Sequence, residues 1–182
     1  MYFLRLVSRF KRRAVISRLH KADIIVASPA FKRLSFIALL HRLMLRSTYV
    51  HSMLYIGNGK ILHTTSNHGV VIHKVPGKIF SKKRYAIYRT RDISRDQKTR
   101  VIEEALKWHR AKIDHVAMFK LIPQRLFGWF RPAAMEEDKS LWCSRLIYRS
   151  FLSAGIDLLP DQDTSLVVSE DLANSPLVKR VF

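Results

Sequence analysis

The stretch His51-Ser-Met-Leu-Tyr-Ile-Gly-Asn-Gly-Lys-Ile-Leu-His63 decides the fold of this chain. Its apolar run is followed by Gly57-Asn58-Gly59, residues that tolerate positive φ and therefore favour a tight turn. After the turn an extended apolar pattern resumes, so the stretch predicts a β-hairpin with a histidine on each strand. We expect His51 and His63 at the same end of the hairpin, although residue parity alone does not fix which face each side chain takes.

A second segment, Trp142-Cys-Ser-Arg-Leu-Ile-Tyr-Arg-Ser-Phe151, is typical of a helix whose first turn carries the only cysteine of the chain. Apolar residues recur at helical spacing and Gly155 suits the C-terminal end, so the predicted helix runs from about Leu141 to Ala154. Unpaired N–H groups and the helix dipole at a first turn stabilise an anion and lower the pKa of a thiol. A thiol, a histidine base and an orienting group are the minimum that a cysteine hydrolase needs.

The rest of the chain predicts a protein of mixed α and β structure. Further strands are expected at residues 69–75 and 85–89. A helix is expected from Ser94, a candidate N-cap, to Lys112. Its expected core face consists of Val101, Ile102, Ala105, Leu106 and Trp108. A short apolar helix is expected at residues 35–45, an irregular segment suited to shaping a substrate cleft at residues 119–140, and turns from Pro160 to the C-terminus.

Four of these stretches, in this order, resemble the permuted papain-like hydrolases of the YiiX/YebB-like group, relatives of the NlpC-type peptidases and of lecithin:retinol acyltransferase. Lys21-Ala-Asp-Ile-Ile-Val26 resembles the family's G-D-I-hydrophobic strand. Tyr49 to Gly59 resembles F-S-H-V-G-I-Y-I-G-N-G, which carries the base, and Ile61-Leu-His63 the next strand, which carries a third polar residue. Trp142 to Tyr148 resembles x-C-S-E-L-V-Y/W, which carries the nucleophile. The resemblance spans roughly residues 21–180.

The resemblance implies an α+β, circularly permuted papain-like (NlpC-type) fold. An antiparallel β-sheet or barrel would carry the histidines and pack against the cysteine-bearing helix. It implies Cys143 as nucleophile, His51 as base and His63 as orienting residue, with no cofactor. The expected reaction is hydrolysis of an amide in a peptide, such as a cell-wall peptide, or of an acyl bond, through an acyl-enzyme. A lipid-directed acyltransferase or thioesterase, and a non-enzymatic basic binding protein on the same scaffold, remain alternatives.

The chain departs from the family pattern at three places. Ala22 stands where the family has glycine, Ser52-Met53 where it has Val-Gly, and Arg145 where it often has Glu. None of these changes removes a catalytic group. A zinc site is disfavoured because the chain has one cysteine and no H-x-x-x-H spacing. Four further residues, Asp23, Tyr49, His68 and His73, are expected to be structural or ordinary surface residues.

Charge is distributed unevenly along the chain, whose formal net charge is +19. Residues 1–91 hold 19 Lys and Arg but a single acid, Asp23, whereas residues 92–182 are almost balanced. This asymmetry favours an anionic membrane or cell-wall polymer as partner, and nucleic acid less, because no base-reading module is present.

The first residues, 1–20, predict a basic amphipathic helix that precedes a single domain at 21–182. The helix would lie on an anionic bilayer or pack its apolar stripe on the domain. Charges interrupt any signal-peptide core and no stretch reaches transmembrane length, so a cytoplasmic or membrane-peripheral location is expected.

Overall fold

The computed structural model describes residues 16–28, 48–75, 85–113, 141–160 and 167–182. The segment predicted as a helix at 35–45 and the irregular segment at 119–140 lie outside these ranges, as does most of the predicted helix at 1–20. Six strands in the described ranges form one antiparallel sheet in the order β4-β3-β2-β1-β5-β6. The strands are β1 (Ile24–Ala27), β2 (His51–Gly57), β3 (Lys60–Thr65), β4 (Gly69–Lys74), β5 (Tyr85–Thr90) and β6 (Val178–Arg180).

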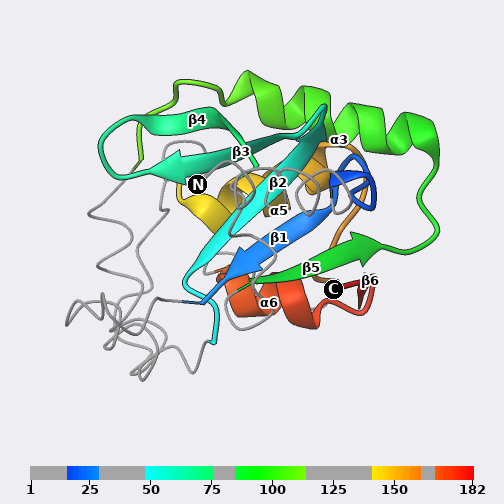
Figure 1. Cartoon of the computed structure of the whole chain (residues 1–182). Helices are drawn as coiled ribbons and strands as arrows, with labels where there is room; N and C mark the ends of the chain where they lie inside the picture. The colour runs from blue at the N-terminus through cyan, green and yellow to red at the C-terminus, as the bar shows by residue number, and fades with distance from the viewer. Residues whose placement is uncertain (1–15, 29–47, 76–84, 114–140, 161–166) are drawn as a thin grey trace, which may run out of the picture.

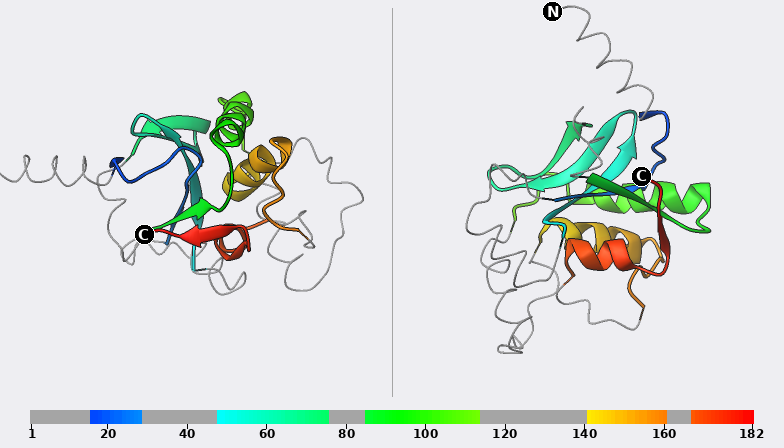
Figure 2. Two further views of the ribbon diagram at one scale, coloured as in Figure 1. Left: turned by 90° about the vertical axis from the view of Figure 1, so that its right-hand side faces the viewer. Right: turned by 60° about the horizontal axis from the view of Figure 1, so that its bottom comes forward.

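Three helices of the described part, α3 (Arg95–Lys107), α5 (Cys143–Ser153) and α6 (Ser169–Asn174), lie on one side of the sheet (Figures 1 and 2). Alternating strand residues divide the core accordingly. Leu54 and Leu62 pack with the helices, around the fully buried Phe151 of α5. Met53 and Ile61 form a second cluster on the opposite face, which Leu19 helps to cover. The mixed α+β class and the packing of the cysteine helix against β2 are therefore confirmed, and the sheet is open rather than closed into a barrel.

The predicted hairpin is present as β2 and β3, and β4 extends it. Asn58 and Gly59 form the turn at φ 51° and 67°, the left-handed region that these residue types tolerate best. The register pairs Met53 with His63 and Leu54 with Leu62, and it shifts between Tyr55 and Gly57.

Helix α3 begins as predicted but ends earlier. Ser94 caps it, with its side chain accepting from the Gln97 N–H while the Gln97 side chain accepts from the Ser94 N–H. The helix stops at Lys107 instead of Lys112 because the chain then turns to bond with β4. The Arg110 N–H donates to the Val70 carbonyl at 2.9 Å, and the Val70 N–H donates to the carbonyl of Ala111 at 2.9 Å.

Two further expectations need correction. Leu106 was expected in the core face of α3, but it is 38% exposed, whereas Val101, Ile102 and Ala105 of the same expected face are buried. The tail after Pro160 contains more than turns: α6 packs beside α5, and β6 pairs with β5 at the edge of the sheet. Both elements are too short to leave a periodic pattern in the sequence. Within the described ranges, no helix combines the length and hydropathy needed to cross a bilayer.

Candidate active site

Cys143 is the first residue of α5, and the residue before it is extended, with Trp142 at φ −140° and ψ 174°. The Trp142 side chain makes no capping hydrogen bond and the first turn holds no acidic residue, so no carboxylate there opposes the helix dipole. Trp142 Nε1 and Ser144 Oγ both donate to the Val167 carbonyl, at 2.7 and 2.8 Å. The residues on either side of the thiol are thus held by one acceptor, which fixes its position.

The thiol lies against the first two residues of β2. Burial is the largest single influence and by itself raises the pKa of Cys143, whereas a hydrogen bond with the His51 side chain is the largest of several effects that lower it. The charge of His51 and hydrogen bonds from the backbone and side chain of Ser52 act in the same direction, and the pKa falls to about 6. An ordinary thiol has a pKa of about 8.5. Cys143 is partly exposed, so a thiolate there is accessible to a substrate.

Three histidines, His51, His63 and His73, form a continuous row of hydrogen-bonded rings. His51 Nε2 lies 3.1 Å from His63 Nδ1, and His63 Nε2 lies 3.0 Å from His73 Nδ1. The first two rings meet edge to face, with centroids 5.3 Å apart at 75°. We call these three residues the histidine row.

The strand register explains the histidine row. His63 pairs with Met53 of β2 and with Val71 of β4. His51 and His73 each lie two residues from those partners, and residues two apart on a strand share a face. All three histidines therefore stand on one face as diagonal neighbours, within reach of one another's rings.

His63 occupies the middle of the row and is the most perturbed member. Burial, followed by the charges of His51 and His73, lowers the pKa of His63 to about 4, although a backbone hydrogen bond with Thr64 acts in the opposite direction. His63 is therefore neutral at physiological pH. A neutral imidazole has one donor and one acceptor nitrogen, and both ring nitrogens of His63 face another histidine.

Helix α6 anchors the start of β2. Glu170 Oε2 accepts hydrogen bonds from the N–H groups of Thr48 and Tyr49, at 2.7 and 3.4 Å. The Ser169 hydroxyl lies 3.3 Å from the Ser52 hydroxyl, and both residues are buried. The tail of the chain thus holds the strand that carries His51.

Asp23 behaves as the structural residue that it was expected to be. Asp23 is buried and accepts a bidentate pair of hydrogen bonds from Arg89, each 2.8 Å long, as well as the His20 N–H. Ala22, where the resemblance has glycine, has φ 66°, a left-handed conformation that favours glycine. Arg145, at the family's Glu position, is buried with its guanidinium 4.9 Å from the centroid of the Trp142 ring.

The structure brings together all three sequence-predicted site residues and adds two that the sequence analysis missed. His73 was expected to be an ordinary surface residue, but its ring joins the histidine row. Ser52 was treated only as a departure from the family pattern, but it bonds the thiol. The alternation of residues 69–75 could have placed His73 on a face, but only the register shows that His63 shares that face. His68, in the turn before β4, is exposed and outside the histidine row.

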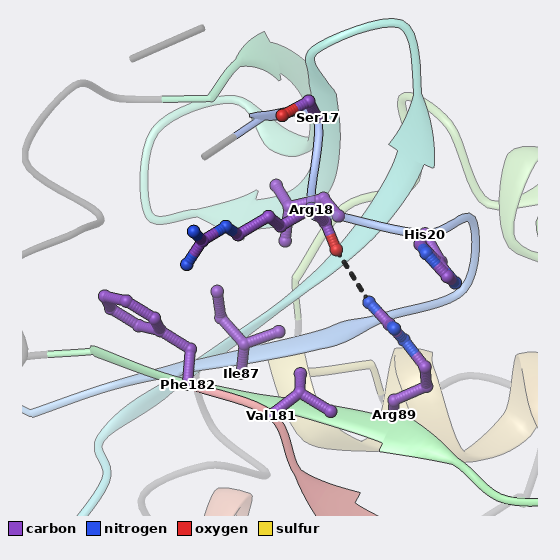
Figure 3. A pocket seen from close by; sticks show the side chains of 8 residues that line it. Ser17, Arg18, His20, Ile87, Arg89, Val181 and Phe182 are labelled. Carbon is purple, nitrogen blue, oxygen red and sulfur yellow. Dashed lines mark hydrogen bonds between the residues drawn. The ribbon is translucent and has the colours of Figure 1, made fainter. Parts of the chain in front are cut away.

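A pocket of about 390 Å³ lies away from this site, against β5 and residues 17–20. Figure 3 shows Arg89 reaching from β5 to the Arg18 carbonyl, which accepts its hydrogen bond at 2.8 Å. No residue of the histidine row lines the pocket, and neither does Cys143. Among the residues that the structure describes, no group of three or more His, Cys, Asp or Glu side chains is arranged to hold a metal ion.

The fold is similar to that of a solved structure, the metalloprotein yiiX from Escherichia coli O157:H7, DUF1105. The two chains share 16% sequence identity at a TM-score of 0.61, over 90% of this chain and 96% of the other. At that identity the likeness establishes the fold alone. No protein-family model matches the chain, and a search of curated proteins finds no match.

Proposed function

We propose that this protein is a cysteine hydrolase of the permuted papain-like, YiiX-like type. In this proposal Cys143 is the nucleophile, His51 the general base and His63 the residue that orients His51. One observation carries the proposal: an acidic thiol at a helix N-terminus is hydrogen-bonded to a histidine whose ring is held by a second histidine. The similar fold of the yiiX structure supports it.

Acylation begins with the proton of the Cys143 thiol on His51. Because His51 Nε2 faces His63, the other ring nitrogen, Nδ1, is the one left for the thiol. The thiolate attacks the substrate carbonyl carbon and forms a C–S bond, and the carbonyl electrons move to oxygen. The oxyanion then collapses, the C–N or C–O bond breaks, and the His51 proton passes to the leaving amine or alkoxide.

Deacylation repeats these steps with water. His51 removes a proton from a water molecule, whose oxygen attacks the thioester carbon, and collapse of the second intermediate releases the acid and the Cys143 thiolate. Backbone N–H groups of the first turn of α5 are the proposed oxyanion donors, because the N-cap side chain does not bond them. A transferase would follow the same path with an alcohol or amine in place of water.

The proposed substrate is an amide of a peptide, such as a cell-wall peptide, or an acyl group of a lipid. The strong positive charge of residues 1–91 favours a substrate or surface that is anionic. An anionic membrane or cell-wall polymer is therefore the proposed partner of the basic half.

The yiiX structure is described as that of a metalloprotein, but metal chemistry does not fit the site in this chain. The ring nitrogens that join the histidine row lie 3.0 to 3.1 Å apart and face one another instead of a common centre. No acidic side chain of the described residues joins them in a cluster. We derive no step through a metal.

The decisive experiment is the pH dependence of Cys143 alkylation by iodoacetamide. The wild type should react with an apparent pKa of about 6. His51→Ala should return the pKa to about 8.5, the ordinary value, while the matched control His68→Ala should leave it unchanged. An ordinary pKa in the wild type, indifferent to His51, would overturn the proposal.

Substrate class is then tested on the same variants with stem-peptide amides and p-nitrophenyl acyl esters, each with and without a primary alcohol or amine as acceptor. Hydrolysis that disappears in Cys143→Ala supports the hydrolase. Product that forms only when the acceptor is present identifies a transferase instead. Salt-sensitive binding to anionic vesicles that Cys143→Ala leaves intact, with no turnover of either substrate, identifies a basic binding protein.

A further inference from the structure

The histidine row includes one residue, His73, that the proposed function does not use. His63 is bonded on its Nδ1 side to the base and on its Nε2 side to His73, which lies on the edge strand β4 and is exposed. Nothing in the proposed reaction requires this third ring, but its geometry constrains the tautomer of the second. This inference rests on the proposed function of the same site and deepens it.

The direction of the hydrogen bonds follows from the state of the base. When His51 holds the thiol proton it is an imidazolium, and both of its ring nitrogens are donors. Its Nε2–H must then donate to His63 Nδ1, so that nitrogen must be unprotonated. If the proton of His63 were on Nδ1, the His51 Nε2–H and the His63 Nδ1–H would point at each other across 3.1 Å, with no acceptor between them.

The proton of neutral His63 must therefore lie on Nε2, where it donates to His73 Nδ1 over 3.0 Å. His73 Nδ1 is the acceptor that favours this tautomer. The exposed position of His73 leaves its own Nε2–H to water, so the row ends without a buried unpaired donor.

We propose that His73 is a positioning residue that locks His63 in its Nε2–H tautomer and thereby preserves the acceptor that the charged base requires. His73 touches neither the thiol nor the substrate. It acts on the reaction only through His63, as the last member of a row in which each ring donates outward from the thiol.

Two measurements on His73→Leu and His73→Gln test the proposal. The tautomer of His63 is read directly from long-range ¹H–¹⁵N correlation spectra of the labelled protein. The wild type should show Nε2–H, and His73→Leu should show a mixture with Nδ1–H. In alkylation, His73→Leu should raise the apparent pKa of Cys143 by about half a unit to one unit, the size of one lost hydrogen bond.

His73→Gln supplies an amide oxygen that can accept from His63 Nε2–H, and it should recover most of both signals. The matched control is His68→Leu, which removes an exposed histidine of the same hairpin outside the row and should change neither. A His63 ring that stays in the Nε2–H tautomer in His73→Leu, with an unchanged Cys143 pKa, would overturn the proposal.

Failure of the proposed function has a different signature. In that case the wild-type thiol itself has an ordinary pKa that does not depend on His51. The NMR spectra still report whether His73 sets the tautomer of His63, so the two proposals fail separately.

Discussion

Two polar networks are built into the same sheet, and they differ in how their charges are matched. In the first, the carboxylate of Asp23 meets the guanidinium of Arg89 in a bidentate pair. Each charge has an opposite charge beside it, and the side chains are 1% and 20% exposed. In the second, Cys143 contacts the histidine row, and each of these groups can be neutral or charged. They offset the free-energy cost of burial by hydrogen bonding to one another and by passing protons between them.

The difference separates structure from chemistry. The bond with Asp23 raises the pKa of Arg89 further above neutrality, so Arg89 stays charged over the physiological range. The pKa of Cys143 falls to about 6 and that of His63 to about 4, so these groups can change state or direct a proton near neutral pH. Oppositely charged partners fix a fold, whereas hydrogen-bonded groups whose pKa values are shifted by their surroundings prepare a reaction.

Removal of the proposed nucleophile should have the largest effect on the reactive network. Cys143→Ala should lower turnover of any ester or amide that the wild type hydrolyses by on the order of a thousandfold or more, since the proposed acyl-enzyme forms on the Cys143 thiol. Initial rates on purified protein measure this loss, with Cys143→Ser as the comparison. Thermal unfolding should show both variants folded, and activity retained in Cys143→Ala would contradict a covalent mechanism.

Asp23→Ala should have the next largest effect, on stability instead of reactivity. It leaves Arg89 without its opposite charge and should reduce the free energy of unfolding by about 3 kcal/mol or more. Urea denaturation measures the loss, and the double variant Asp23→Ala/Arg89→Leu should recover part of it. The folded fraction should keep its acidic thiol, and a Cys143 pKa shifted by Asp23→Ala would show that the two networks are coupled.

Acid should weaken the fold through His63. Its pKa is about 4 in the folded state and about 6.5 unfolded, so between these values the unfolded chain binds more protons. Stability should therefore fall as the pH falls through this window, with a slope of up to about 1.4 kcal/mol per pH unit from this residue. Denaturation at a series of pH values measures the slope. His63→Asn should flatten it, and an equal slope in that variant would assign the effect to other groups.

Ser52→Ala should produce the smallest change. It removes the hydroxyl that bonds the thiol but keeps the backbone N–H, so the pKa of Cys143 should rise by about half a unit to one unit. Iodoacetamide titration measures the shift. Ser169→Ala removes only the hydroxyl beside Ser52, and it should move the pKa less. A larger shift in Ser169→Ala than in Ser52→Ala would contradict this order.

The sequence by itself determined the parts of this protein that depend on local chemistry. Asn58-Gly59 specified a tight turn because these residues accept positive φ, and Ser94 with Gln97 specified a helix start because their side chains satisfy nearby N–H groups. Cys143 was assigned to the first turn of a helix because the apolar spacing of the residues that follow it is also a local signal. The family resemblance then linked the cysteine to His51 and His63, and the structure brings these three together.

Only the tertiary structure decided what depends on register and on distant partners. The place of His73 required the pairing of both β2 with β3 and β3 with β4, and a shift of one residue in either pairing would have turned a ring to the other face. Helix α3 ended five residues early because β4 bonds the Arg110 N–H and the Ala111 carbonyl. The role of Ser52 depended on α5, which follows it in the chain by about ninety residues. Local side-chain chemistry is encoded residue by residue, whereas contacts between distant segments exist only once the sheet has folded.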